Sequence, residues 1–151
     1  MAVILSTAGF WAPAVYKVPG DDLSVTSTKL RIRWKRLSRT DRKAMDARLA
    51  ARIDLMRISL AVNTATPADT EALKELAITE QQFLEEMIVD WELADARGQA
   101  VPYTLQELRE TCDLNDGFDV QLFSSYFEAL GKLNQPREIE KNSDAPSDTT
   151  T

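Results

Sequence analysis

A strict alternation of apolar and basic side chains between residues 30 and 35 restricts the fold of this chain more than any other feature. The apolar set is Leu30, Ile32 and Trp34, and the basic set is Arg31, Arg33 and Lys35. Successive side chains of a β-strand point to opposite faces of a sheet, so the pattern predicts a strand with one buried and one cationic face. Antiparallel sheets commonly cover only one face, and we therefore expect an antiparallel strand.

A partner strand is expected on the N-terminal side. Residues 14–18 favour β-structure, and the Pro19-Gly20 pair that follows is a turn signal. We expect all strands to fall within about residues 3–36, including a short one at Val3–Leu5. No Lys or Arg precedes the apolar start of the chain, so we expect no cleaved signal peptide. We also expect no membrane span, because no run approaches the ~18 apolar residues that one needs.

The rest of the chain has helical periodicity. We expect helices at about residues 40–60, 67–90, 104–112 and 118–130. In the first, apolar residues recur at spacings of three and four and should face a core; they are Met45, Leu49, Ile53, Met56 and Leu60. Ser38 or Thr40 is a candidate cap for this helix, Thr104 is one for the third, and Gly131 should end the last.

Length and composition predict a single α+β domain over residues 1–136, with an N-terminal hairpin or small antiparallel sheet packed against about four helices. The chain has 151 residues, of which 44% are hydrophobic, and this is enough for one core. Residues 137–151 are polar and poor in apolar groups, so we expect a disordered tail.

The chain contains no histidine and a single cysteine, Cys112. These counts exclude Cys/His zinc sites and nucleophilic machinery of the Ser-His or Cys-His type. We therefore expect no catalytic residues, no metal and no cofactor, and a protein that is not an enzyme. One cysteine cannot form an intrachain disulfide, which favours a reducing cytoplasm.

The charge of the chain is segregated. Residues 29–57 hold eleven of the eighteen Lys and Arg residues against three aspartates, so this segment carries a formal charge of +8 and the remainder −14. The segment has three interpretations: a solvated face compensated by acidic residues of the second half, a surface for an acidic protein or a second copy, and a nucleic-acid site. As its interaction residues we select Arg31, Arg33, Arg39 and Arg42.

The second half resembles the tail assembly chaperones of long-tailed phages. The resemblance covers residues 28–131 and is carried by Lys35–Arg42, Asp90–Gly98, Val101–Thr104, Leu108 and Phe123–Leu130. It implies structural roles: a tryptophan that fills the core beneath a helix end, an Asp…Gly turn, and a proline ahead of a threonine cap. The motif residues are Trp91, Asp95, Gly98, Pro102, Tyr103, Thr104 and Tyr126.

The resemblance also implies a function. Such proteins bind the tape measure protein, a very long helical chain, and keep it soluble in the host bacterial cytoplasm until tail-tube subunits polymerise around it. Self-association is a further expectation, motivated by the segregated charge. Two alternatives remain open: a phage-encoded inhibitor of a host protein, and a nucleic-acid-binding regulator that uses residues 29–57.

Overall fold

The computed structural model describes residues 9–60 and 67–134. The elements in chain order are β1 (Phe10–Pro19), β2 (Val25–Trp34), α1 (Arg39–Leu60), α2 (Pro67–Leu76), α3 (Glu80–Met87), β3 (Ile88–Glu92), α4 (Leu105–Leu114) and α5 (Phe118–Asn134). The strands form one antiparallel sheet in the order β1-β2-β3, which confirms the α+β class. The strand expected at residues 3–5 and the polar tail at 137–151 lie outside the described residues.

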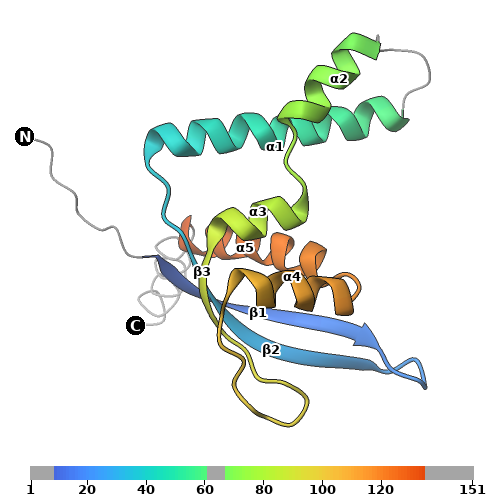
Figure 1. Ribbon diagram of the computed structural model, residues 1–151, viewed down its shortest axis with the longest axis vertical. Coiled ribbons are helices and arrows are strands. Elements are labelled where there is room, and N and C mark those ends of the chain that lie inside the picture. The colour runs from blue at the N-terminus through green and yellow to red at the C-terminus, as the bar shows by residue number, and fades with distance from the viewer. Residues whose placement is uncertain (1–8, 61–66, 135–151) are drawn as a thin grey trace, which may run out of the picture.

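The alternation in β2 is confirmed. Leu30, Ile32 and Trp34 are at most 4% exposed, whereas Arg31 and Lys35 are exposed on the other side of the strand. Helices α3, α4 and α5 gather on one side of the sheet (Figure 1). The Trp34 ring packs against Phe83 of α3 and Tyr126 of α5, with ring centroids 6.4 and 5.1 Å apart. The core therefore lies between the apolar face of β2 and these helices.

The single helix predicted at residues 67–90 is wrong, because the segment forms α2, α3 and β3. The Thr79 hydroxyl accepts a hydrogen bond from the Gln82 amide, and the Gln82 side chain accepts one from the Thr79 amide. This reciprocal cap starts a new helix at Glu80. From Ile88 onward the backbone pairs with β2, and a β-branched pair, Ile88-Val89, suits that strand.

The last two helices begin where they were expected. The Thr104 hydroxyl accepts a hydrogen bond from the Glu107 amide, as predicted for the cap of α4. Helix α5 does not stop at Gly131 but continues to Asn134. Leu122 and Tyr126 are buried on this helix, whereas Phe127 is 40% exposed.

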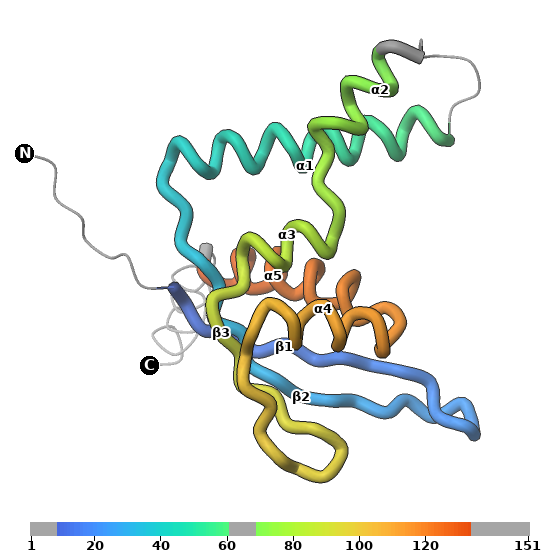
Figure 2. The backbone as a smooth tube through the Cα atoms, in the orientation of Figure 1, coloured from blue at the N-terminus to red at the C-terminus, as the bar shows by residue number. Residues whose placement is uncertain are grey.

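Helices α1 and α2 lie apart from the sheet, on the far side of α3 (Figure 1). The backbone trace rises from β2 into α1 and returns from α2 into α3, so two short connections join this pair to the rest of the domain (Figure 2). We call α1 and α2 together the arm. Helix α1 is 22 residues long and begins at Arg39, and the hydroxyl of the preceding Ser38 accepts a hydrogen bond from the Asp41 amide.

Candidate protein-binding surface

Two ion pairs and one core residue hold the arm on α3. Arg48 lies 2.8 Å from Glu86, and Arg52 lies 2.5 Å from Glu80. The Arg52 guanidinium also stacks 4.9 Å above the centroid of the Phe123 ring. Met45, at the N-terminal half of α1, enters the main core. The part of α1 from Met45 to Arg52 is therefore fixed by charge and by packing.

The electrostatics of the Arg52–Glu80 pair follow from its partial burial. Both side chains are about one quarter exposed, at 24% and 23%. The hydrogen bond from Arg52 lowers the pKa of the Glu80 carboxyl below its usual 4.5, an effect that desolvation partly opposes. The same bond raises the pKa of Arg52. Both groups therefore stay charged at neutral pH, and their pairing stabilises the attachment of the arm.

The apolar stripe predicted to face a core is covered only at its beginning. Met45 is 7% exposed, but Ile53, Met56 and Leu60 are 50%, 55% and 84% exposed. The prediction that they are core residues is wrong, because α2 contacts a different face of α1. We call Ile53, Met56 and Leu60 the arm stripe.

The face of α1 that is turned toward α2 can be read from the helical period. Ala51 is 3% exposed although it lies outside the main core, and Leu55 and Ile58 are partly buried. These three residues are spaced at four and three, so they share one side of α1. The arm is thus a helix pair with a small interface of its own, and this interface leaves the arm stripe half exposed or more.

Two of the four selected arginines extend the arm stripe. Arg39 and Arg42 are exposed in the first turn of α1, and their spacing from one another and from Ile53 places them on the same helix face. Neither forms an ion pair within the part of the chain that the structure describes. This face of α1, roughly 30 Å long, is therefore cationic at its start, packs on the core at Met45 and Leu49, and is apolar and exposed at its end.

The other two selected arginines lie in the sheet and do not join this face. Arg31 pairs with Glu92 at 3.2 Å, and its guanidinium stands 5.2 Å from the centroid of the Trp11 ring. Arg33 is half-buried opposite Asp90, and its Nε is buried with no hydrogen-bond partner in the described residues. The four selected arginines therefore do not form one surface. Arg31 and Arg33 lie on the sheet, whereas Arg39 and Arg42 lie on the arm.

Part of the basic segment is neutralised by the second half of the chain. Arg31, Arg48 and Arg52 are paired with glutamates of β3 and α3. At these three positions the outcome agrees with the first interpretation, in which acidic residues of the second half neutralise the basic segment. Most of the exposed remainder is concentrated where β2 leads into α1, namely Lys35, Arg36, Arg39, Arg42 and Lys43; Lys29 and Arg57 are also exposed, and Arg57 pairs with Asp54.

A hollow lies beside the arm stripe. Its volume is about 360 Å³, and it is lined from α1 by Leu55 and Met56 and from the α2–α3 side by Lys74, Ala77 and Ile78. A hollow next to exposed apolar side chains offers a place where an apolar side chain of a partner can be buried. The sequence analysis did not predict this hollow. It expected one continuous helix over residues 67–90, whereas the break between α2 and α3 shapes the hollow.

The motif residues of the second half have structural roles. Trp91 is 4% exposed and donates its indole N–H to the Val101 carbonyl at 2.8 Å, but it lies on β3 and not at a helix end as expected. Its ring packs edge-on against Tyr103, with centroids 5.0 Å apart. The Asp95 carboxylate accepts the amides of Arg97 and Gln99. The polypeptide is thus folded back at this turn.

The remaining motif residues also have structural roles. Gly98 has a φ of +80°, a conformation that suits glycine and closes the Asp95 turn. Pro102 is exposed two residues ahead of the Thr104 cap. Tyr126 is buried in the core at 3% exposure. Each of these residues shapes the turn or fills the core.

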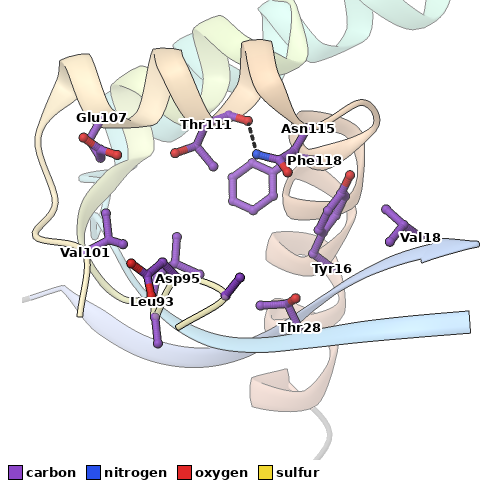
Figure 3. A pocket seen from close by; sticks show the side chains of 12 residues that line it. Tyr16, Val18, Thr28, Leu93, Asp95, Val101, Glu107, Thr111, Asn115 and Phe118 are labelled. Carbon is purple, nitrogen blue, oxygen red and sulfur yellow. Dashed lines mark hydrogen bonds between the residues drawn. The ribbon is translucent and has the colours of Figure 1, made fainter. Parts of the chain in front are cut away.

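A cavity of about 440 Å³ opens under α4, between the sheet and the turn at residues 93–101 (Figure 3). Tyr16 and Phe118 form its inner wall, and the Tyr16 hydroxyl donates to the Asp116 carbonyl. Asp95 and Glu107 supply carboxylates at the other end. The Asp95 carboxylate already accepts hydrogen bonds from the amides of its own turn. The lining combines apolar side chains with hydroxyl, amide and carboxylate groups, so the cavity can hold an apolar or hydrogen-bonding group.

Cys112 is half-buried on α4. Desolvation, followed by the charges of Asp119 and Glu85, raises its thiol pKa to about 11. A thiol with this pKa is almost entirely protonated at neutral pH, so Cys112 is a packing residue.

Within residues 9–60 and 67–134, His, Cys, Asp and Glu form no group of three or more suited to a metal ion. In the same ranges, no helix combines the length and apolar character needed to cross a bilayer. Comparisons of the chain with protein-family models, with curated proteins and with solved structures find no match.

Proposed function

We propose that this chain is a tail assembly chaperone that binds the helical tape measure protein through its arm and keeps it soluble. The observation that carries the proposal is the arm stripe, where three large apolar side chains of one helix are at least half exposed. Exposed apolar surface of this kind typically marks a protein-binding site. The motif resemblance in the second half supports the choice of client.

The shape of the arm suits a helical client. A helix laid along α1 would bury its own apolar stripe against Ile53, Met56 and Leu60 and place acidic residues beside Arg39 and Arg42. Half-exposed side chains contribute roughly 1 kcal/mol each when they are covered. A single contact would therefore be weak, whereas many copies along one long client would hold it firmly.

The test is co-expression of the chain with a candidate tape measure protein, scored by the soluble fraction of that client. A variant with Ile53→Ser, Met56→Ser and Leu60→Ser should lose the solubilising effect and keep its circular dichroism spectrum. The matched control changes exposed apolar residues off the arm, Leu105→Ser, Leu114→Ser and Val120→Ser, and should solubilise like the wild type. Equal client solubility with the arm variant would refute the proposal.

The cationic end of the same face is tested separately. The double variant Arg39→Glu, Arg42→Glu should abolish capture of the client in a pull-down, because reversed charge repels acidic residues of the bound helix. Arg97→Glu with Lys132→Glu changes the net charge equally at exposed sites off the arm and should leave capture intact. Unchanged capture with the Arg39/Arg42 variant would remove these residues from the binding surface.

A nucleic-acid-binding regulator is the second candidate, favoured by the exposed cations between Lys35 and Lys43. Phosphate contacts would make binding steeply dependent on salt. The acidic remainder of the chain, with its formal charge of −14, opposes this function. No retention of duplex DNA at about 50 mM salt would exclude it, since electrostatic binding is strongest at low ionic strength.

A further inference from the structure

Glu107 of α4 is a partly buried carboxylate without a cationic partner among the described residues. Three described glutamates are partly buried, namely Glu80, Glu85 and Glu107. Glu80 pairs with Arg52 at 2.5 Å. Glu85 pairs with Arg109 at 2.6 Å. The Glu107 carboxylate has neither an ion pair nor a hydrogen bond with any described residue. Partial burial disfavours a charge that lacks a partner, so this position indicates a cation supplied by a ligand.

The Glu107 side chain lines the cavity of about 440 Å³ under α4 (Figure 3). Thr111 and Asn115 follow it at intervals of four residues, so the three side chains share one side of the helix over about 12 Å. All three line the cavity. The Asn115 side-chain nitrogen donates to the Thr111 carbonyl at 2.9 Å, which leaves the Asn115 side-chain oxygen as an acceptor. The α4 wall therefore presents a carboxylate, a hydroxyl and an amide oxygen.

The facing walls of the cavity are mainly apolar and aromatic. The rings of Tyr16 and Phe118 pack edge to face with centroids 5.3 Å apart. Leu93 and Val101 line the cavity at the start and the end of the turn. The Tyr16 hydroxyl donates its proton to the Asp116 carbonyl at 2.7 Å, so its oxygen can offer a ligand only an acceptor. The cavity can thus cover an apolar stem and accept hydrogen bonds from its head group.

Negative charge surrounds this cavity. Of the described residues that line it, only Asp95 and Glu107 are charged. Residues 105–119 carry five carboxylates against one arginine, a formal charge of −4; these residues are Glu107, Glu110, Asp113, Asp116, Asp119 and Arg109. A field of this sign concentrates cations and repels anions. The electrostatics therefore favour a cationic ligand.

The chemistry of the lining favours an organic cation over a metal ion. Hard metal ions are held by about six or more oxygen ligands, whereas most of this lining is apolar or aromatic. Ammonium and guanidinium groups only donate hydrogen bonds, which suits a wall of acceptors. Aromatic rings such as those of Tyr16 and Phe118 also attract organic cations and cover apolar stems.

We propose that the cavity under α4 binds a small organic cation, an ammonium or guanidinium group on an apolar stem. The head group pairs with Glu107 and donates to the Thr111 hydroxyl, and the stem lies against Tyr16 and Phe118. The same chemistry occurs in a free amine or guanidine and in the Lys or Arg side chain of a partner protein. The site uses no residue of the arm, so it goes beyond the proposed client binding.

An NMR titration of the full, ¹⁵N-labelled chain with phenethylamine tests the proposal. The amide resonances of Val101, Glu107 and Thr111 should shift with a Kd on the order of 1 mM, which is typical of a ligand of this size. 2-Phenylethanol has a similar shape without the charge and should bind about tenfold more weakly. 3-Phenylpropionate carries the opposite charge and should not bind.

Glu107→Gln should weaken phenethylamine binding about tenfold and leave 2-phenylethanol binding unchanged, because only the charge pair is lost. A substitution that merely disturbed the fold would weaken both probes alike. The matched control, Glu110→Gln, removes the same charge from an exposed position on the same helix and should leave both affinities unchanged. Thr111→Phe fills the cavity and should abolish binding of both probes.

Two further probes distinguish the possible sources of the cation. Propylguanidine is a free guanidinium on a short stem, whereas Nα-acetyl-arginine N-methylamide carries the same group on a piece of polypeptide backbone. Binding of the arginine derivative at least as tight as that of propylguanidine would identify a partner's side chain. Binding about tenfold weaker or more would identify a free small molecule, because the cavity then excludes the backbone.

The absence of shifts at the cavity residues with phenethylamine at about twenty times the expected Kd would overturn the proposal. So would equal affinities for the amine, the alcohol and the carboxylate, or amine binding that Glu107→Gln leaves unchanged. These titrations need no client, and the arm variants leave the cavity residues intact. Failure of the client experiments would therefore not alter the titrations, and the two proposals can fail separately.

Discussion

Arg52 of α1 and Glu80 of α3 form an ion pair at 2.5 Å, although 28 residues separate them in the sequence. This pair and the neighbouring Arg48–Glu86 pair join the arm to the body of the domain. The cations of the basic segment are thereby divided between two tasks. Arg48 and Arg52 attach the arm to α3, whereas Arg39 and Arg42 remain exposed on α1.

Loss of the Arg52–Glu80 pair should loosen the arm in a pH-dependent way. Glu80→Gln should cost about 1 kcal/mol of unfolding free energy at neutral pH, the range for partly exposed pairs. The pKa of Glu80 is lowered in the folded state, so its contribution is complete above pH 4.5 and declines as the pH falls through the folded-state pKa. Urea denaturation of wild type and variant between pH 7 and pH 3 should show the difference shrinking with acidity. A constant difference would contradict this assignment.

Gln121 should protect the free edge of β1. Its side-chain amide accepts from the Lys17 N–H and donates to the Lys17 carbonyl, both at 2.8 Å. Gln121→Ala should cost roughly 1 kcal/mol and accelerate hydrogen exchange at the Lys17 amide, since an edge strand loses its only side-chain partner there among the described residues. Gln106→Ala removes a glutamine from an exposed helix pair and should leave that exchange rate unchanged.

Trp91 should be the largest single contributor to the stability of the β3 region. Trp91→Ala should lower the unfolding free energy by about 3–5 kcal/mol, because a buried indole is replaced by a cavity. Trp91→Phe keeps most of the volume but loses the hydrogen bond to the Val101 carbonyl, and should cost about 1–2 kcal/mol. Urea denaturation measures both. Equal losses for the two variants would mean that packing against Tyr103 is of minor importance.

Cys112 should react slowly with alkylating reagents. Its pKa of about 11 lies two pH units above the ordinary value of 9.0, so at pH 8 its thiolate fraction is smaller by about a hundredfold. Iodoacetamide labelling followed by mass spectrometry should show a rate at least that much below the rate in urea-unfolded protein. Equal rates in the two states would show that the thiol is neither desolvated nor protected.

Several features were predictable because they depend on neighbouring residues. The alternation in β2 and the Thr104 cap were read correctly, since strand faces and helix caps are fixed within a few residues. The α+β class followed from these local signals. In the candidate site, the exposure of Arg39 and Arg42 was also anticipated, as charged residues at a helix start face solvent.

The sequence by itself determined which segments are helix or strand in most of the chain, and where its charge gathers. The tertiary structure decided what covers each face. Periodicity shows that Ile53, Met56 and Leu60 share one side of α1, but only the position of α2 leaves that side open. Likewise Ile88–Glu92 became a strand because β2 offered an unpaired edge. Burial and sheet pairing depend on residues distant in sequence, and a local pattern does not contain them.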